Sequence, residues 1–155
     1  MRVLCLGASR TGTMSLYTAL TKLGFRVYHM NEAVKSPRTS FGCWTEAIHA
    51  KYHGDGTPFG RAEWDKLLGD FDAGADVPFA TFGVELIRAY PEAKVVLNHR
   101  DVDAWLGSMG KTAGRVLSWP SWPWVAGWDP GLAGPWWEFV KEVMVRMYPV
   151  QEGKG

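Results

Sequence analysis

The chain has 155 residues, of which 46% are hydrophobic and 21% charged, values typical of one globular domain with its own core. Its 17 basic and 16 acidic residues leave a net charge of +1, which argues against nucleic-acid binding through bulk charge. The two cysteines are too few for a disulfide framework, and no apolar run reaches the roughly 20 residues of a membrane-spanning helix. We therefore expect a cytoplasmic protein with no nucleic-acid partner, signal peptide or transmembrane segment.

The first segment of the chain has the pattern of an anion site. Val3–Leu6 is an apolar run that predicts a buried strand, and Thr13–Leu23 has the apolar spacing of a helix that ends at Gly24. Between them lies a small, hydroxyl-rich loop with the spacing Gly7-x4-Gly12. A strand, a glycine-rich loop and a helix in this order bind anions, because loop N–H groups and the helix N-terminus direct positive charge at the ligand.

This loop departs from the P-loop of triphosphate-binding enzymes at one position. The P-loop pattern GxxxxGK[ST] has lysine after its second glycine, whereas this chain has Thr13 there. The cation of the loop is Arg10, two residues before Gly12. We therefore expect an anion-binding loop without the lysine that reaches the β- and γ-phosphates. Thr11, Thr13 and Ser15 have a second interpretation as helix caps, which requires no ligand.

The rest of the first two thirds alternates between strands and helices. In chain order, the pattern predicts a strand at Phe25–Tyr28, helices at Thr45–Tyr52 and Arg61–Leu68, a strand end at Asp76–Pro78, a helix at Phe82–Tyr90, a strand at Lys94–Asn98 and a helix from Val102 to Met109 or beyond. The apolar, β-branched centre of Lys94–Asn98 is typical of a parallel strand covered on both faces. We expect an α/β fold of three layers, α/β/α, with a central parallel sheet of the P-loop NTPase-like type.

The last third of the chain is rich in tryptophan and proline. Six tryptophans and four prolines fall between Trp119 and Trp137, and the prolines predict irregular structure up to a final helix at about Trp136–Met147. We divide the single domain into an α/β core, residues 1–117, and a Trp- and Pro-rich flap with a terminal helix, residues 118–155. Three interpretations of the flap stay open: a rigid cover, a wall of an acceptor pocket, and a surface for a partner or a membrane.

Two motifs together carry a family resemblance. Sulfotransferases that use 3′-phosphoadenosine 5′-phosphosulfate (PAPS) bind its 5′-phosphosulfate with a Pro-Lys-Ser-Gly-Thr-Thr loop, and Ser9–Met14 resembles that loop, with Arg10 in place of the lysine. The family's second motif is an arginine just after a central strand and a serine eight positions later, which Arg100 and Ser108 resemble. The resemblance covers roughly residues 1–110, and it is closest to a sulfotransferase-like group common in fungi.

The resemblance implies a cofactor and the residues that bind it. The implied cofactor is PAPS, whose product is adenosine 3′,5′-bisphosphate, and the implied binding residues are Ser9, Arg10, Thr11, Gly12, Thr13, Met14, Arg100 and Ser108. Independently of the family, a guanidinium fork can meet a phosphate through two parallel hydrogen bonds. The alternatives are that Arg100 pairs with Asp101 or Asp103 and that Ser108 is an ordinary exposed serine.

The implied reaction moves a sulfuryl group from PAPS to a hydroxyl or amine of a small, apolar or aromatic acceptor. Such a transfer requires mainly positioning and charge stabilisation, which Arg10 would supply. Two side chains at predicted strand ends, His29 and Asp76, are the candidates for the general base. Their alternatives are a structural histidine and a turn-capping aspartate. No metal is expected, because the histidines at positions 29, 49, 53 and 99 show no recognised zinc or iron spacing.

Other functions stay open on the sequence alone. Arginine does not easily hand over a proton, so a sulfotransferase-like fold with Arg10 could serve secondary metabolism without sulfation, as a cyclase or a small-molecule-binding protein. A P-loop nucleotide kinase is disfavoured by the absence of lysine after Gly12, and a docking module would use Trp119–Trp137. Family members usually add a basic, glycine-containing C-terminal loop over the 3′-phosphate, for which Gly153-Lys154 is a poor substitute. The sequence therefore predicts a truncated chain or a minimal fold.

Overall fold

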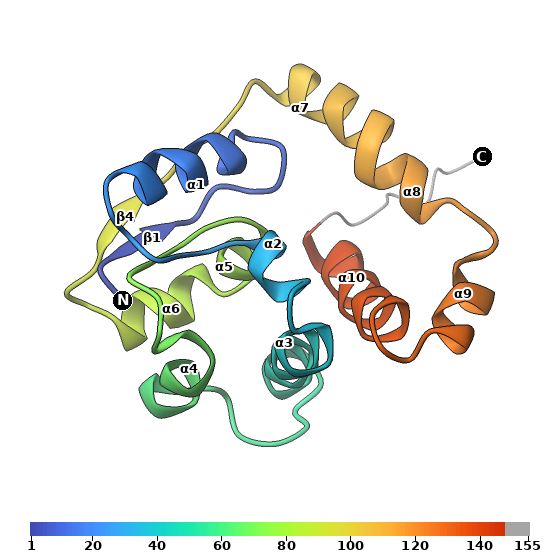
Figure 1. Ribbon diagram of the computed structural model, residues 1–155, viewed down its shortest axis with the longest axis horizontal. Helices are drawn as coiled ribbons and strands as arrows, with labels where there is room; N and C mark the ends of the chain where they lie inside the picture. Colours follow the sequence, from blue (N-terminus) through green and yellow to red (C-terminus); the bar gives the residue numbers. More distant parts are fainter. Residues whose placement is uncertain (148–155) are drawn as a thin grey trace.

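A computed structural model describes residues 1–147 of the chain (Figure 1). Gly153-Lys154 therefore lies outside the described residues. Four short parallel strands form one sheet in the order β2-β3-β1-β4. Their bounds are β1 Val3–Cys5, β2 Val27–Tyr28, β3 Ala73–Gly74 and β4 Lys94–Val96. Because all four run in one direction, their carboxyl ends meet at a single edge, where open α/β sheets bind their ligands.

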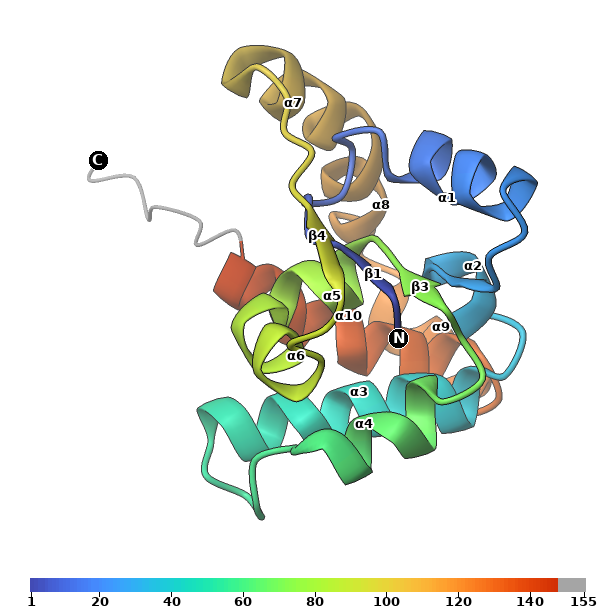
Figure 2. The ribbon, with the colours of Figure 1, turned by 90° about the vertical axis from the view of Figure 1, so that its left-hand side faces the viewer.

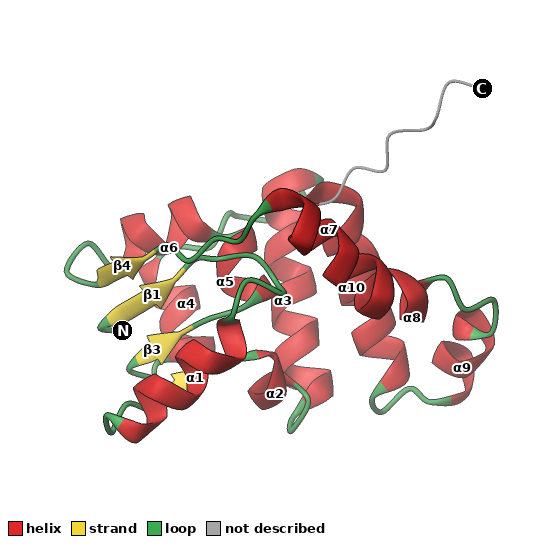
Figure 3. Ribbon diagram, turned by 90° about the horizontal axis from the view of Figure 1, so that it is seen from above, coloured by secondary structure: helices red, strands yellow, loops and turns green. Residues whose placement is uncertain are grey.

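Helices cover both faces of the sheet. Figure 3 shows α1 (Thr13–Lys22) in front of the strands and the helices α3 to α6 behind them. The alternation of strand residues explains this: Val3 and Cys5 pack toward Leu16 and Leu20 of α1, whereas Leu4 belongs to the core on the opposite face. The expected three-layer α/β/α arrangement around a parallel sheet is the one observed.

The larger core lies behind the sheet and is mostly aromatic. It is built by α3 (Pro37–Tyr52), α4 (Arg61–Leu68), α5 (Val77–Thr81), α6 (Gly83–Ala89) and α10 (Ala133–Met147). Trp44 lies fully buried at its centre and donates a hydrogen bond from Nε1 to the hydroxyl of Tyr28, over 2.8 Å. Figure 2 shows α3 and α4 side by side below the sheet.

Several predicted boundaries hold and others do not. The helices at Arg61–Leu68 and Val102–Met109 (α7) have the predicted bounds. Helix α3 begins at Pro37 rather than Thr45, because proline is favoured in the first turn of a helix. The predicted strand end at Asp76–Pro78 is wrong, since β3 ends at Gly74 and Val77 begins α5.

The strand β4 is an edge strand, contrary to the prediction that both of its faces are covered. All three of its residues are exposed, and the neighbouring Leu97 has 72% of its surface accessible. Among the described residues, β4 pairs with β1 alone. The β-branched residues therefore predicted a strand correctly, but the prediction that this strand is buried is wrong.

The last third of the chain is helical rather than irregular. Helix α7 continues through a π-helical turn, Gly110–Gly114, into α8 (Arg115–Leu117), followed by α9 (Trp122–Trp128) and α10. The predicted terminal helix at about Trp136–Met147 is confirmed as α10. The predicted irregular stretch before it is wrong, because Pro123 and Pro135 lie in first helical turns, where proline is tolerated. The remaining helix, α2 (Met30–Ala33), follows β2. None of the described helices combines the length and apolarity that a bilayer crossing needs.

Candidate functional site

The candidate site lies at the carboxyl edge of the sheet. The loop Ser9–Met14 follows β1, His29 follows β2, Asp76 comes two residues after β3, and Asn98 comes two residues after β4. The parallel order therefore brings four chain segments together that the sequence separates.

The loop after β1 is held by a residue that the sequence analysis did not single out. Asn98 donates from Nδ2 to the hydroxyl of Thr11 over 2.6 Å and to its carbonyl over 3.2 Å. A side chain at Gly7 would collide with Asn98, which explains the glycine there. At the end of the loop, Gly12 has φ 100°, a left-handed conformation that favours glycine, and α1 begins after it. The sequence did offer one signal for Asn98: it is the polar residue at the end of the β-branched run Lys94–Asn98.

The two sulfotransferase-like motifs meet at Arg10. Its Nε donates to the hydroxyl of Ser108 over 3.1 Å, and its carbonyl accepts from Nη1 of Arg100 over 3.1 Å. The preceding main-chain carbonyl, that of Ser9, accepts from Nε1 of Trp105 over 2.8 Å. The structure therefore brings together the predicted residues of both motifs, although Ser108 contacts Arg10 from α7 rather than lining the cavity described below.

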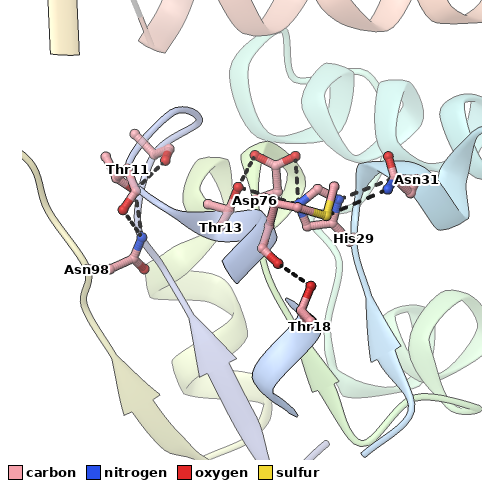
Figure 4. Close-up of polar contacts among 9 residues, drawn as sticks. Thr11, Thr13, Thr18, His29, Asn31, Asp76 and Asn98 are labelled. Atoms are coloured by element: carbon pink, nitrogen blue, oxygen red, sulfur yellow. Dashed lines mark hydrogen bonds and ion pairs between the residues drawn. The ribbon is translucent and has the colours of Figure 1, made fainter. Parts of the chain in front are cut away.

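Three polar side chains form a buried cluster beside the loop (Figure 4). Asp76 Oδ2 lies 3.4 Å from His29 Nε2, and Thr13 donates from Oγ1 to Asp76 Oδ1 over 3.4 Å. The backbone N–H of Asn31 donates to His29 Nδ1 over 3.3 Å. Because Nδ1 is an acceptor, we assign the proton of neutral His29 to Nε2, which faces Asp76.

Burial sets the charge of this cluster. The side chains of His29 and Asp76 are 5% and 9% exposed. Removal from water lowers the pKa of His29 below its usual value, although the carboxylates of Asp76 and Glu32 act in the opposite direction. We therefore expect a neutral His29 at neutral pH.

The backbone of Asp76 is strained. Its φ of 77° and ψ of −169° fall in a region populated almost only by glycine. Such a conformation costs on the order of 1–3 kcal/mol and persists only where the surroundings impose it. Strain of this kind concentrates at functional sites, so the backbone points to Asp76 independently of the side-chain contacts.

Two cavities meet at this cluster. The polar cavity has a volume of ≈ 450 Å³ and is lined by Ser9, Arg10, Gly12, Thr13, Met14, His29, Met30, Asn31, Asp76 and Arg100. The second, of ≈ 460 Å³, is mostly apolar and lies between the Met109–Trp119 segment and α10. Ser9, Met30 and Asp76 line both cavities, so Asp76 stands where the two meet.

The tryptophan-rich segment divides between this cavity and the surface. Trp119 and Trp136 line the apolar cavity, and Trp122 packs between them, with ring centroids 6.4 and 4.7 Å away. Trp124 and Trp128 of α9 are 75% and 88% exposed. Part of the predicted flap is thus a cavity wall.

The potential metal ligands of the described residues lie elsewhere. His49, His53 and Glu142 place one ligand atom each within 4.8 Å of one another, and none of the three lines either cavity. The spacing of the histidines alone did not indicate this group, because its third member, Glu142, lies far away in the sequence.

The comparisons with known proteins agree with the geometry. A family model described as a sulfotransferase domain matches residues 2–154. The chain belongs to the sulfotransferase family. This sulfotransferase-family chain is also 40% identical, over 144 residues, to the Ava biosynthesis cluster protein M of Aspergillus versicolor. The match covers 93% of the chain and 55% of that relative, so the chain spans about half of the relative's length. The predicted resemblance is confirmed, and so is the α/β fold with its parallel sheet.

Proposed function

We propose that this sulfotransferase-family chain transfers a sulfuryl group from PAPS to a hydroxyl or amine of a small, apolar acceptor. One observation carries the proposal: Asp76 lines both a polar cavity that contains Arg10 and Arg100 and a mostly apolar cavity whose wall includes two tryptophans. A transferase needs its donor and acceptor sites to meet at one reactive group.

The polar cavity has the charge that a donor with two anionic ends requires. Arg10 and Arg100 are its cationic side chains, and the N-terminus of α1 adds the positive end of a helix dipole. In the proposal Arg10 stabilises the transferring group and Arg100 binds the 3′-phosphate. Ser108, the other residue of that motif, does not line the cavity in this structure and would join the phosphate site by giving up its hydrogen bond to Arg10. Ser9, Thr11, Gly12, Thr13 and Met14 form the loop that receives the 5′ end.

The hydrogen bonds of the buried cluster support Asp76 as the general base. Both nitrogens of neutral His29 are engaged, one by Asn31 and the other toward Asp76. Each carboxylate oxygen of Asp76 accepts from one neighbour and keeps a lone pair. Of the two predicted candidates, Asp76 then takes the proton, and His29 and Thr13 are positioning residues that orient its carboxylate.

In the proposed step, the acceptor's O–H or N–H proton passes to Asp76, and the acceptor atom forms a new bond to sulfur. The bond from sulfur to the bridging phosphate oxygen breaks, and adenosine 3′,5′-bisphosphate leaves with that electron pair. No metal is needed in this step, because Arg10 and the helix N-terminus supply the positive charge.

A second candidate is a non-sulfating protein of secondary metabolism that binds a small molecule or cyclises it. Its support is the arginine at position 10 where the family resemblance has lysine, together with the relative's description as a biosynthesis cluster protein. A nucleotide kinase is disfavoured, because Thr13 occupies the P-loop lysine position and bonds to Asp76. A cytoplasmic location also remains a proposal, supported by free Cys5 and Cys43.

Isothermal calorimetry separates these functions. We expect the chain to bind adenosine 3′,5′-bisphosphate more tightly than Mg-ATP, and mass spectrometry to find a sulfated product after incubation with PAPS and a panel of phenols and alcohols. Preference for Mg-ATP would support the kinase. Bisphosphate binding without a sulfated product on any acceptor would favour the second candidate, and absence of binding to both nucleotides would overturn the donor site.

A further inference from the structure

We propose that His49, His53 and Glu142 form a site for a divalent transition metal, with zinc as the probe, that links α3 to α10. His49 lies in the last turn of α3 and His53 caps its C-terminus, whereas Glu142 belongs to α10. One ligand atom from each side chain lies within 4.8 Å of the other two. The site thus joins two helices through His53 and Glu142, which are 89 residues apart in the chain.

The geometry of the pair follows from helix periodicity. Residues four positions apart lie on one helix face, and the two imidazole rings are accordingly 5.0 Å apart between centroids. Glu142 completes the group from the facing helix, with Oε2 3.0 Å from Nε2 of His53. Zinc requires the three ligand atoms to lie about 2.0–2.2 Å from a common ion, so the proposal needs the side chains to move closer together than the 4.8 Å within which they now lie.

The ligand types select the metal class. Two imidazoles and one carboxylate suit zinc and other first-row transition metals rather than calcium or magnesium, which prefer all-oxygen ligands. His49 and Glu142 are half-buried, and His53 is exposed, so an ion can enter from solvent. Three protein ligands leave a fourth tetrahedral position for water.

The location indicates a structural consequence. Helix α10 supplies Trp136, Phe139, Val140 and Val143 to the apolar cavity. It packs on α3 through Phe41 and Phe139, whose ring centroids are 5.5 Å apart. A metal held by both helices would fix the wall of that cavity. This proposal does not depend on sulfuryl transfer, and it revises the sequence-based expectation that the chain uses no metal.

Zinc binding to the metal-stripped full chain tests the proposal. We expect one zinc ion per chain by calorimetry, and a melting temperature that rises with zinc concentration. His49→Ala and Glu142→Gln should each lower zinc affinity by more than about tenfold, since even the loss of an outer-shell partner typically costs about 10–100-fold. His99→Ala is the matched control, because His99 is an exposed histidine outside the cluster and should leave affinity unchanged.

The test of Glu142 distinguishes a metal site that links α3 to α10 from a site made only by the two histidines of α3. If Glu142→Gln binds zinc as tightly as the parent chain, the ion sits on α3 alone and the proposal is overturned. Equal loss in His99→Ala, or no saturable binding by the folded parent chain, overturns it as well. Hydrogen exchange provides the second readout: zinc should slow exchange in α10 of the parent chain and of His99→Ala, but not of Glu142→Gln. Circular dichroism checks that each variant is folded.

Discussion

Arg100 donates a hydrogen bond from Nη1 to the main-chain carbonyl of Arg10, over 3.1 Å, and so joins two motifs that lie 90 residues apart. The guanidinium of Arg10 in turn donates to Ser108. Both arginines line the same polar cavity at the carboxyl edge of the sheet. A cofactor with an anion at each end requires this proximity, and motifs on opposite faces would have excluded it.

The first prediction concerns these two arginines. Arg10→Ala and Arg100→Ala should each weaken binding of adenosine 3′,5′-bisphosphate by ~1.5–3 kcal/mol, the range for hydrogen bonds to charged groups. Calorimetry measures the loss, and Arg88→Ala, an exposed arginine of α6, is the control. Unchanged affinity in both site variants would exclude the proposed donor site.

The second prediction separates binding from chemistry at Asp76. Asp76→Asn keeps the shape of the side chain but removes the base, so kcat for sulfation should fall by roughly 10²–10⁴-fold. Bisphosphate affinity should stay at the parent value, because the donor contacts are assigned to the arginines and the loop. A variant that keeps the parent kcat would show that Asp76 is not the base.

The third prediction is a pH dependence of stability. The folded-state pKa of His29 is lowered from 6.5, first by burial, so the unfolded chain binds the proton more readily than the folded chain. The contribution of His29 to stability is therefore complete above pH 6.5 and is lost as the pH falls through the folded-state pKa. Denaturant unfolding of the parent chain should show this loss below pH 6.5, and His29→Gln should show a smaller pH slope. An identical slope in the variant would contradict the assignment.

The fourth prediction tests the apolar cavity as the acceptor site. Ala113 is half-buried and lines the cavity, so Ala113→Phe should occupy part of it and raise the acceptor KM severalfold while leaving bisphosphate affinity unchanged. Ala62→Phe makes the same change on the exposed surface of α4 and should alter neither quantity. Steady-state kinetics with one fixed acceptor measures the effect. Equal KM values in the two variants would place the acceptor elsewhere.

The sequence predicted the loop and the helices correctly where a few neighbouring residues determine the backbone conformation. The spacing Gly7-x4-Gly12 identified the loop because a left-handed residue at position 12 and a tight approach at position 7 both favour glycine. Helix Arg61–Leu68 has the predicted bounds because its ends depend on neighbouring residues alone: Gly60 and Gly69 flank it directly. The burial of β4 could not be found this way, since it depends on which segments pack beside the strand.

The sequence by itself determined a phosphate-type loop with an arginine, a second arginine after a strand, and alternating strands and helices, because each is a property of a few neighbouring residues. Only the tertiary structure decided that Thr13, His29 and Asp76 touch, because strand order and direction bring their three strand ends to one edge. It alone placed Glu142 against His53, because helix packing joins residues that no local spacing relates. The apolar cavity beside Asp76 likewise exists only because α10 returns to face the Met109–Trp119 segment.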